Sequence, residues 1–157
     1  MKRLLSLLLA AMLCVCLALP APAARAEQNS ITIYSMLLFL IQGFGVQPTA
    51  AYDVTDMLTD SEVLNTDETV IGFLMHQNWL LLSGLNSQDE YAATVFVYED
   101  DTFFVLLEAI AGAYESLQQM TSRPQEKLII EITFQEGATY VFDSAGDAAA
   151  LLELFSE

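Results

Sequence analysis

An apolar run from Leu4 to Leu19 opens the chain, directly after the basic residues Lys2 and Arg3. A run of this length is slightly short for a membrane-spanning helix, which needs roughly 20 apolar residues. A basic start followed by an apolar core is typical of a secretory signal peptide. We therefore expect a bacterial protein that is secreted or exported to the cell envelope, and we expect only the remainder of the chain to fold.

Small residues after this run supply the expected cleavage site. Ala24-Arg25-Ala26 has the small-x-small form that a signal peptidase cleaves. Cleavage after Ala26 removes residues 1–26 and leaves residues 27–157 as a single mature domain; cleavage after Ala23 and an uncleaved membrane anchor are the alternatives. Both cysteines precede this site. A mature domain without cysteine must be held together by packing rather than by disulfides.

Charge is distributed very unevenly along the chain. All 21 acidic residues lie after residue 26, whereas only Arg123 and Lys127 of the five basic residues do. The mature domain therefore has 21 acidic and two basic residues, a net charge of −19. Nucleic-acid binding and charge-driven docking on anionic lipid both need a basic surface, so this composition excludes them. Such a surface would attract cations or a basic protein, or would serve only to keep the protein soluble.

Hydrophobic periodicity and turn residues predict three main helices and five strands. The main helices are expected over residues 31–42, 102–120 and from Ser144 to about Phe155, and a short helix is expected over 48–58. The strands are expected over residues 69–75, 79–83, 94–98, 127–134 and 138–142. Ser30 is the expected cap of the first helix, and Ser144 with Asp147 resembles a capping box. A strand start at Ile31 is the alternative for the first segment.

These elements follow the order α-β-β-β-α-β-β-α, which predicts an α+β fold with an antiparallel sheet of about five strands. The segment 127–142 gives the clearest signal, because side chains alternate with a period of two before the turn at Gln135-Glu136-Gly137. The element order resembles that of the class I type III secretion chaperones, which are also small and acidic. The resemblance covers most of the mature chain and implies similarity of fold alone.

Asp53, Asp56 and Asp60 are the candidate metal ligands. Spacings of three and four place them on one face if this segment is helical. Calcium is bound by several carboxylates together with backbone carbonyls. No D-x-D-x-D-G loop accompanies these residues. A weak calcium site and a solvated acidic face are therefore the two interpretations, and no other cofactor is expected.

A second acidic group is followed by two aromatic residues. The candidate partner-binding residues are Asp89, Glu90, Glu99, Asp100, Asp101, Phe103 and Phe104. The carboxylates would steer a basic protein or peptide to the surface, and an exposed ring would then anchor it. Packing in the core is the alternative for both rings.

No catalytic motif accompanies these residues. His76 is the only histidine, and Ser83-Gly84 lacks the G-x-S-x-G context of an activated nucleophile. A hydrolase with two carboxylates needs them to face each other across a cleft, and a chain with 21 acidic residues gives no means of choosing the pair. We therefore expect a non-catalytic domain that presents an acidic surface to a basic protein or peptide. Calcium binding and a carboxylate-based hydrolase are the alternatives.

Overall fold

The computed structural model describes residues 30–61, 67–75, 77–99 and 102–154. The expected signal peptide, His76, Asp100, Asp101 and Phe155 lie outside these residues. Within the described ranges the chain forms a six-stranded sheet and five helices, whereas the sequence predicts about five strands and three main helices. In the same ranges no helix combines the length and the apolar composition needed to cross a membrane.

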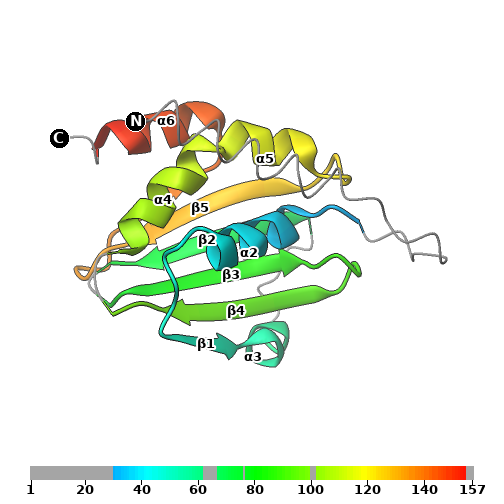
Figure 1. Ribbon diagram of the computed structural model, residues 1–157, viewed down its shortest axis with the longest axis horizontal. Coiled ribbons are helices and arrows are strands. Elements are labelled where there is room, and N and C mark those ends of the chain that lie inside the picture. Colours follow the sequence, from blue (N-terminus) through cyan, green and yellow to red (C-terminus); the bar gives the residue numbers. More distant parts are fainter. Residues whose placement is uncertain (1–29, 62–66, 76, 100–101, 155–157) are drawn as a thin grey trace.

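The elements follow the order α2-β1-α3-β2-β3-β4-α4-α5-β5-β6-α6 along the chain (Figure 1). The helices are α2 (Ile33–Gly43), α3 (Thr55–Thr59), α4 (Phe103–Gly112), α5 (Tyr114–Met120) and α6 (Ala145–Leu154). The strands are β1 (Ala50–Asp53), β2 (Glu68–Leu74), β3 (Trp79–Leu85), β4 (Tyr91–Val97), β5 (Lys127–Thr133) and β6 (Thr139–Phe142). The five predicted strands are therefore confirmed with shifted ends, and β1 is added to them.

The sheet has the strand order β1-β4-β3-β2-β5-β6 and is mixed rather than antiparallel. β2 and β5 run parallel, in register from Glu68 opposite Lys127 to Leu74 opposite Thr133. The other neighbouring strands are antiparallel. The prediction of an antiparallel sheet is therefore wrong for the β2–β5 pair. α4 and α5 carry the chain across the sheet between β4 and β5, and a parallel neighbour requires a long connection of this kind.

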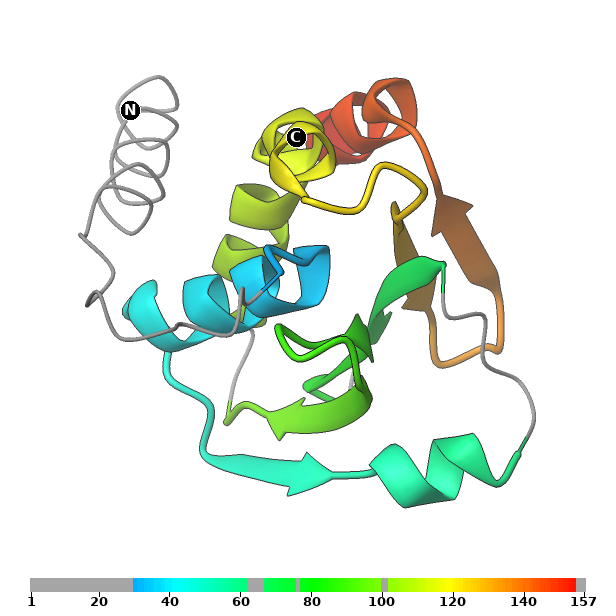
Figure 2. The same cartoon turned by 90° about the vertical axis from the view of Figure 1, so that its right-hand side faces the viewer.

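Helices α2, α4, α5 and α6 lie on one side of the sheet (Figure 2). Alternate strand residues face these helices and are buried, among them Ile71, Phe73, Leu80, Leu82 and Ile130. The helices add their own buried side chains to one hydrophobic core, including Leu37, Leu106 and Leu117. Burial of this apolar area is the main term that favours the fold.

The first helix is confirmed, but its cap differs from the prediction. Thr32 rather than Ser30 caps α2, and the Thr32 hydroxyl accepts a hydrogen bond of 3.1 Å from the Ser35 N–H. The Ser35 hydroxyl in turn accepts one of 3.2 Å from the Thr32 N–H, which completes a capping box. Ser30 instead donates its hydroxyl hydrogen to Asp89 Oδ1.

Two other helix predictions need correction. In the segment 48–58, β1 pairs with β4 and only α3 is helical, because pairing in a sheet supplies the backbone hydrogen bonds that a helix would otherwise make. The predicted helix over 102–120 is divided into α4 and α5 at Ala113. The break follows Gly112, and glycine is the poorest helix former in this segment.

The C-terminal hairpin and helix agree with their sequence signals. β5 and β6 pair from Ile130 opposite Phe142 to Thr133 opposite Thr139. Gly137 in the turn has a φ of +90°, which glycine adopts without strain. The Ser144 hydroxyl accepts a hydrogen bond of 3.2 Å from the Asp147 N–H, so the predicted cap of α6 is confirmed.

Candidate functional site

A cleft of about 380 Å³ opens where β5 extends beyond the end of β6. β6 pairs only with residues 130–133, so the first residues of β5 have no strand neighbour on that side within the described part of the chain. The cleft lies between this part of β5, the start of β2, helix α5 and the turn from β6 into α6. Its walls include Glu68, Tyr114, Glu115, Lys127, Ile129 and Asp143.

Helix α5 takes the place of a strand neighbour for the start of β5. The Tyr114 hydroxyl donates a hydrogen bond of 2.7 Å to the carbonyl oxygen of Leu128. Gln118 Oε1 accepts a hydrogen bond of 2.9 Å from the Leu128 N–H, and Gln118 Nε2 donates to the carbonyl oxygen of Glu126. These side chains satisfy the backbone groups that β6 leaves unpaired, so α5 and its cleft-lining residues are held in place.

Three carboxylates and one ammonium group line the cleft. Glu68 and Lys127 are register partners at the starts of the parallel strands β2 and β5. Glu115 is exposed in the first turn of α5, and Asp143 directly precedes the Ser144 cap. The ends of four different elements therefore bring together side chains that are far apart in the sequence, and their net charge is negative.

The buried Tyr114 lies near one of these carboxylates, that of Asp143. Burial raises the pKa of its hydroxyl, and the carboxylates of Asp143 and Asp147 raise it further because they oppose a second negative charge. The carboxylates in the lining can accept charge-assisted hydrogen bonds from a cationic group. Tyr114 and Ile129 add apolar surface against which the stem of a long basic side chain can pack.

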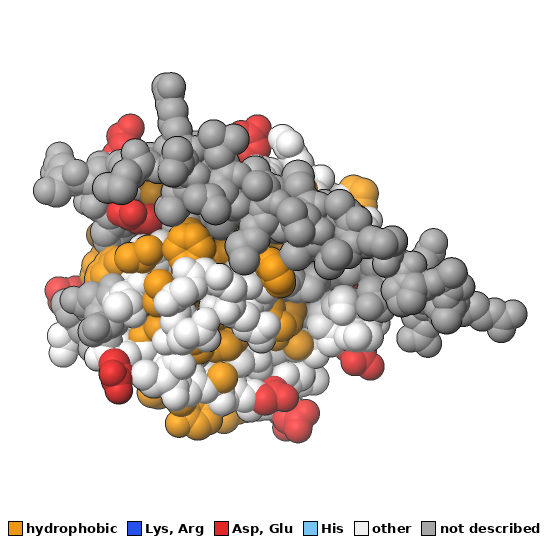
Figure 3. Space-filling model, viewed as in Figure 1, with side chains coloured by type: hydrophobic (Ala, Val, Ile, Leu, Met, Phe, Trp, Pro, Cys, Tyr) orange, Lys and Arg blue, Asp and Glu red, His pale blue; other side chains and the backbone are white. Residues whose placement is uncertain are grey.

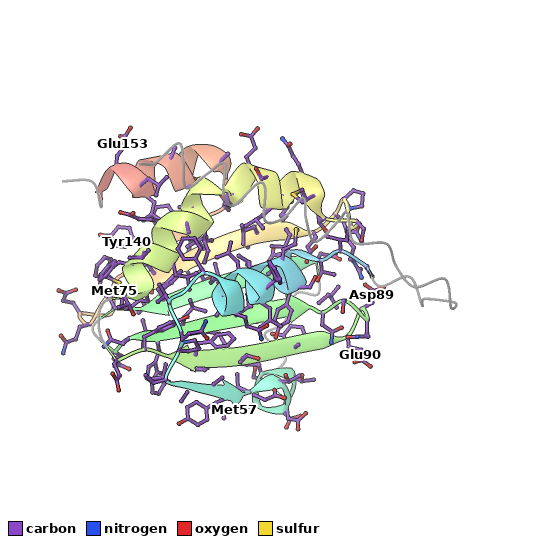
Figure 4. All side chains as sticks on the ribbon, viewed as in Figure 1. Met57, Met75, Asp89, Glu90, Tyr140 and Glu153 are labelled. Atoms are coloured by element: carbon purple, nitrogen blue, oxygen red, sulfur yellow. The ribbon has the colours of Figure 1, made fainter. Side chains whose placement is uncertain are left out.

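The acidic residues predicted to bind a partner do not form one patch. Asp89 and Glu90 lie in the connection between β3 and β4, at the same end of the molecule (Figure 4). Glu99 lies beyond the other end of β4. The seven residues of this strand span about 23 Å at about 3.3 Å per residue. Asp100 and Asp101 lie outside the described residues.

Asp89 already has two partners within the protein. Its Oδ1 accepts hydrogen bonds of 2.8 Å from the Ser30 hydroxyl and from Arg123 Nη1. The bond from Ser30, and then the one from Arg123, hold the pKa of the Asp89 carboxyl below its ordinary value. Asp89 therefore ties the segment before α2 to the segment after α5, whereas Glu90 is exposed.

The two aromatic residues predicted to anchor a partner differ in exposure. Phe103 is 1% exposed, and its ring stacks with those of Phe73 and Phe104 at centroid distances of 6.1 and 4.5 Å. Phe104 is half-buried and packs against the same core. Phe103 thus belongs to the core, and only Phe104 of the two has surface to offer a partner.

The three candidate calcium ligands lie at the ends of α3. Asp53 Oδ1 accepts hydrogen bonds of 2.5 Å from the Thr55 hydroxyl and 2.9 Å from the Thr55 N–H, and both lower the pKa of Asp53. Asp56 is in the first turn of α3, and Asp60 follows its last residue. Across the described ranges, no group of three His, Cys, Asp or Glu side chains is placed to hold a metal ion. The calcium site stays a prediction.

Glu126 carries no sequence signal, yet it is the one buried carboxylate among the described residues. It accepts hydrogen bonds from the Ile33 N–H and from the hydroxyls of Thr69 and Thr121. These contacts satisfy both of its oxygens, so we assign Glu126 to the stability of the fold rather than to binding. A lone acidic residue just before a strand gives no hint of such burial.

No protein-family model, curated protein or solved structure matches the chain. The resemblance to class I type III secretion chaperones therefore rests on element order alone. The parallel β2–β5 pair and the added strand β1 also differ from the element pattern on which that resemblance was based. Function must accordingly follow from the chemistry of the site.

Proposed function

We propose that the protein is an exported, non-catalytic binding domain for a basic protein or peptide. The cleft beside β5 would hold a Lys or Arg side chain of that partner. The observation that carries this proposal is the lining of the cleft, where three carboxylates (Glu68, Glu115 and Asp143) accompany a single cation, Lys127. An ammonium or guanidinium group bound there would form charge-assisted hydrogen bonds and offset the excess negative charge.

The charge of the rest of the chain supports the same kind of partner. Residues 27–157 contain 21 acidic and two basic residues, and one of the two, Arg123, is paired with Asp89 at 2.8 Å. Figure 3 shows carboxylates around the margin of one face, with no Lys or Arg visible there among the described side chains. Such a field speeds the approach of a cationic partner and repels an anionic one.

The size of the cleft suits a basic side chain. Its volume of about 380 Å³ falls within the range of small-ligand sites, which is roughly 300–1,000 Å³. Lys and Arg combine an apolar stem with a charged end. The stem would contact Ile129 and Tyr114, while the charged end would bind the carboxylates.

Isothermal titration calorimetry with hexalysine tests this proposal. Binding should be measurable at low salt and should weaken at least about tenfold in 0.2 M salt, because salt screens exposed charges beyond about 10 Å. The triple variant Glu68→Gln/Glu115→Gln/Asp143→Asn should lose most of the binding.

The matched control is Asp60→Asn/Glu108→Gln/Glu136→Gln, which removes the same charge from exposed positions outside the cleft. This control should retain most of the affinity for hexalysine. Equal losses in the two triple variants would show that net charge, and not the cleft, is responsible for binding. No binding by the unaltered protein at low salt would overturn the proposed function itself.

A further inference from the structure

The face of the sheet opposite α2, α4, α5 and α6 is unusually apolar. A sheet with one face in water normally carries polar side chains on that face. Here six of the outward positions, which alternate with the buried ones, hold half-buried apolar residues: Val70, Leu74, Leu81, Val95, Val97 and Ile129. Polar or charged residues occupy other outward positions: Glu68, Ser83, Lys127, Glu131 and Thr133. We call the six apolar residues the outer strip.

Two aromatic side chains extend the outer strip into solvent. Trp79 lies between Leu74 and Val97 in the register and is 47% exposed. Tyr52 lies opposite Val95 on the edge strand β1 and is 58% exposed. Exposed aromatic residues beside apolar surface are enriched where proteins bind one another.

Gly72 places no side chain in the middle of this face, and we call the space above it the hollow. Gly72 lies in the central strand β2, between Leu81 of β3 and Glu131 of β5. Among the described residues, a β-carbon at Gly72 would meet nothing nearer than Leu81 Cβ at 4.0 Å, and the φ of Gly72 is not positive. Neither the described neighbours of Gly72 nor its backbone conformation therefore requires glycine here. Glycine inside a strand often marks a place where a ligand or another chain approaches closely.

Glu131 borders this hollow on the side of β5. The residue is half-buried, and the register places its side chain on the outer face next to Gly72. Lys127 shares that face but lies four residues away along β5, which is about 13 Å. Among the described residues, the one ion pair is that of Arg123 with Asp89. Glu131 therefore offers a strong acceptor in apolar surroundings to a cation that comes from outside.

We propose that the outer strip is the docking surface for a basic amphipathic segment of the partner protein. Apolar side chains of that segment would cover Leu81 and Trp79, and a Lys or Arg side chain would enter the hollow over Gly72 and pair with Glu131. This inference rests on the proposed function and deepens it. Ile129 belongs both to the outer strip and to the wall of the cleft, so one segment would reach both.

Charge selects this occupant over others. A second copy of the domain would bring a further 21 acidic and two basic residues to the interface, and like charges repel. A bilayer with anionic lipids would be repelled for the same reason. A segment in which apolar and basic residues alternate complements both the outer strip and Glu131.

Trp79 provides a direct readout, because it is the only tryptophan in the chain. Titration with an octapeptide of alternating Leu and Lys should shift the fluorescence of Trp79 to shorter wavelength, because its indole ring leaves water. Hexalysine and an octapeptide of alternating Leu and Glu are the comparison ligands, and neither should produce this shift.

Two variants test the hollow and its carboxylate. Gly72→Val should weaken binding of the Leu-Lys peptide at least about tenfold by filling the hollow, and should raise the melting temperature because valine favours strands. Gly72→Ala serves the same purpose with a smaller side chain. Glu131→Gln should weaken binding about fivefold or more, whereas Glu108→Gln on the exposed surface of α4 should leave it unchanged.

The outcomes separate this inference from the proposed function. An unchanged Trp79 spectrum, or full affinity in Gly72→Val, would overturn the outer strip as the docking surface while hexalysine binding in the cleft still stood. The absence of hexalysine binding by the unaltered protein at low salt would overturn the proposed function instead. Self-association in sedimentation, or a Trp79 shift with anionic vesicles and not with the peptide, would assign the outer strip to a different occupant and overturn the inference.

Discussion

The carboxylate of Glu126 accepts a hydrogen bond of 2.7 Å from the hydroxyl of Thr69, 57 residues earlier in the chain. Glu126 is 2% exposed, and it also accepts bonds of 3.1 Å from the Ile33 N–H and 2.6 Å from the Thr121 hydroxyl. One carboxylate thus joins the start of α2, the start of β2 and the end of α5. Three donors offset the cost of removing this polar group from water.

Replacement of Glu126 should therefore destabilise the protein strongly. Glu126→Ala should lower the free energy of unfolding by about 3–5 kcal/mol, because it leaves buried donors without an acceptor. Glu126→Gln should cost about 1–3 kcal/mol, because the amide keeps only one acceptor. Urea denaturation followed by circular dichroism measures both values. Glu136→Ala in the exposed β5–β6 turn is the control, and equal midpoints for Glu126→Ala and this control would contradict the account.

Gly84→Ala should disturb the same network from the neighbouring strand. A β-carbon at Gly84 would lie 2.6 Å from Thr69 Oγ1 and 3.1 Å from two carbons of that side chain. Thr69 cannot move away without weakening its hydrogen bond to Glu126. We therefore expect Gly84→Ala to lower the free energy of unfolding by about 1–3 kcal/mol.

The matched control for Gly84→Ala is Gly112→Ala in α4, where a β-carbon would meet none of the described residues within 4 Å. Alanine has a higher helix propensity than glycine. The free energy of unfolding of Gly112→Ala should therefore rise by about 0.5–1 kcal/mol. Thermal unfolding of the two variants should therefore give shifts of opposite sign. A melting temperature for Gly84→Ala at or above that of the unaltered protein would show that Thr69 is not constrained as described.

Asp89 should contribute stability that depends on pH. Hydrogen bonds from Ser30 and Arg123 lower its pKa from the ordinary value of 3.8. A lowered pKa in the folded state gives stability that is present above about pH 4 and lost as the pH falls through the folded pKa. Asp89→Asn keeps a residue that tolerates the φ of +60° at this position. Its melting temperature should lie below that of the unaltered protein at pH 7 and converge with it near pH 2. A constant difference across this range would rule out the contribution.

Tyr98 should make stability depend on pH in the alkaline range, where stability is lost as the pH rises rather than as it falls. Its side chain is 2% exposed, its hydroxyl has no hydrogen-bond partner among the described residues, and burial raises its pKa to about 12. In the unfolded chain the value is about 10, so stability should be lost as the pH rises from about 10 through 12.

Tyr98→Phe removes both the unpaired hydroxyl and this titration. The variant should be at least as stable as the unaltered protein at pH 7, and should lose less stability between pH 10 and 12. Melting temperatures at the two ends of this range measure the effect, with Tyr52→Phe on the exposed edge strand as the control. A marked drop in stability of Tyr98→Phe at pH 7 would mean that the hydroxyl is satisfied.

Local sequence signals predicted most of the elements but not their pairing. The alternation before Gly137 and the cap at Ser144 depend on neighbouring residues, and both predictions are confirmed. β1 was missed because Ala50–Asp53 becomes a strand only through its contact with β4. The parallel alignment of β2 with β5 likewise depends on how α4 and α5 cross the sheet, which no local pattern encodes.

The candidate sites show the same limit. Acidic residues that are close in sequence, such as Glu90 and Glu99, lie at opposite ends of β4, whereas Glu68, Glu115 and Asp143 meet in one cleft. The apolar residues of the outer strip also carry no separate signal, because β2, β3 and β4 have apolar residues at both inward and outward positions. Only the register distinguishes the face that packs against α2, α4, α5 and α6 from the opposite face.

The central claim is that a basic segment binds across the outer strip and the adjoining cleft. Backbone chemical-shift mapping by NMR, with the alternating Leu-Lys octapeptide at low salt, tests it most directly. We predict that the largest shifts fall on Gly72, Leu81 and Glu131 and continue to Ile129, with little change at Leu40 on α2 or Val105 on α4. Shifts confined to α2 and α4, or the absence of any localised shift, would contradict the account.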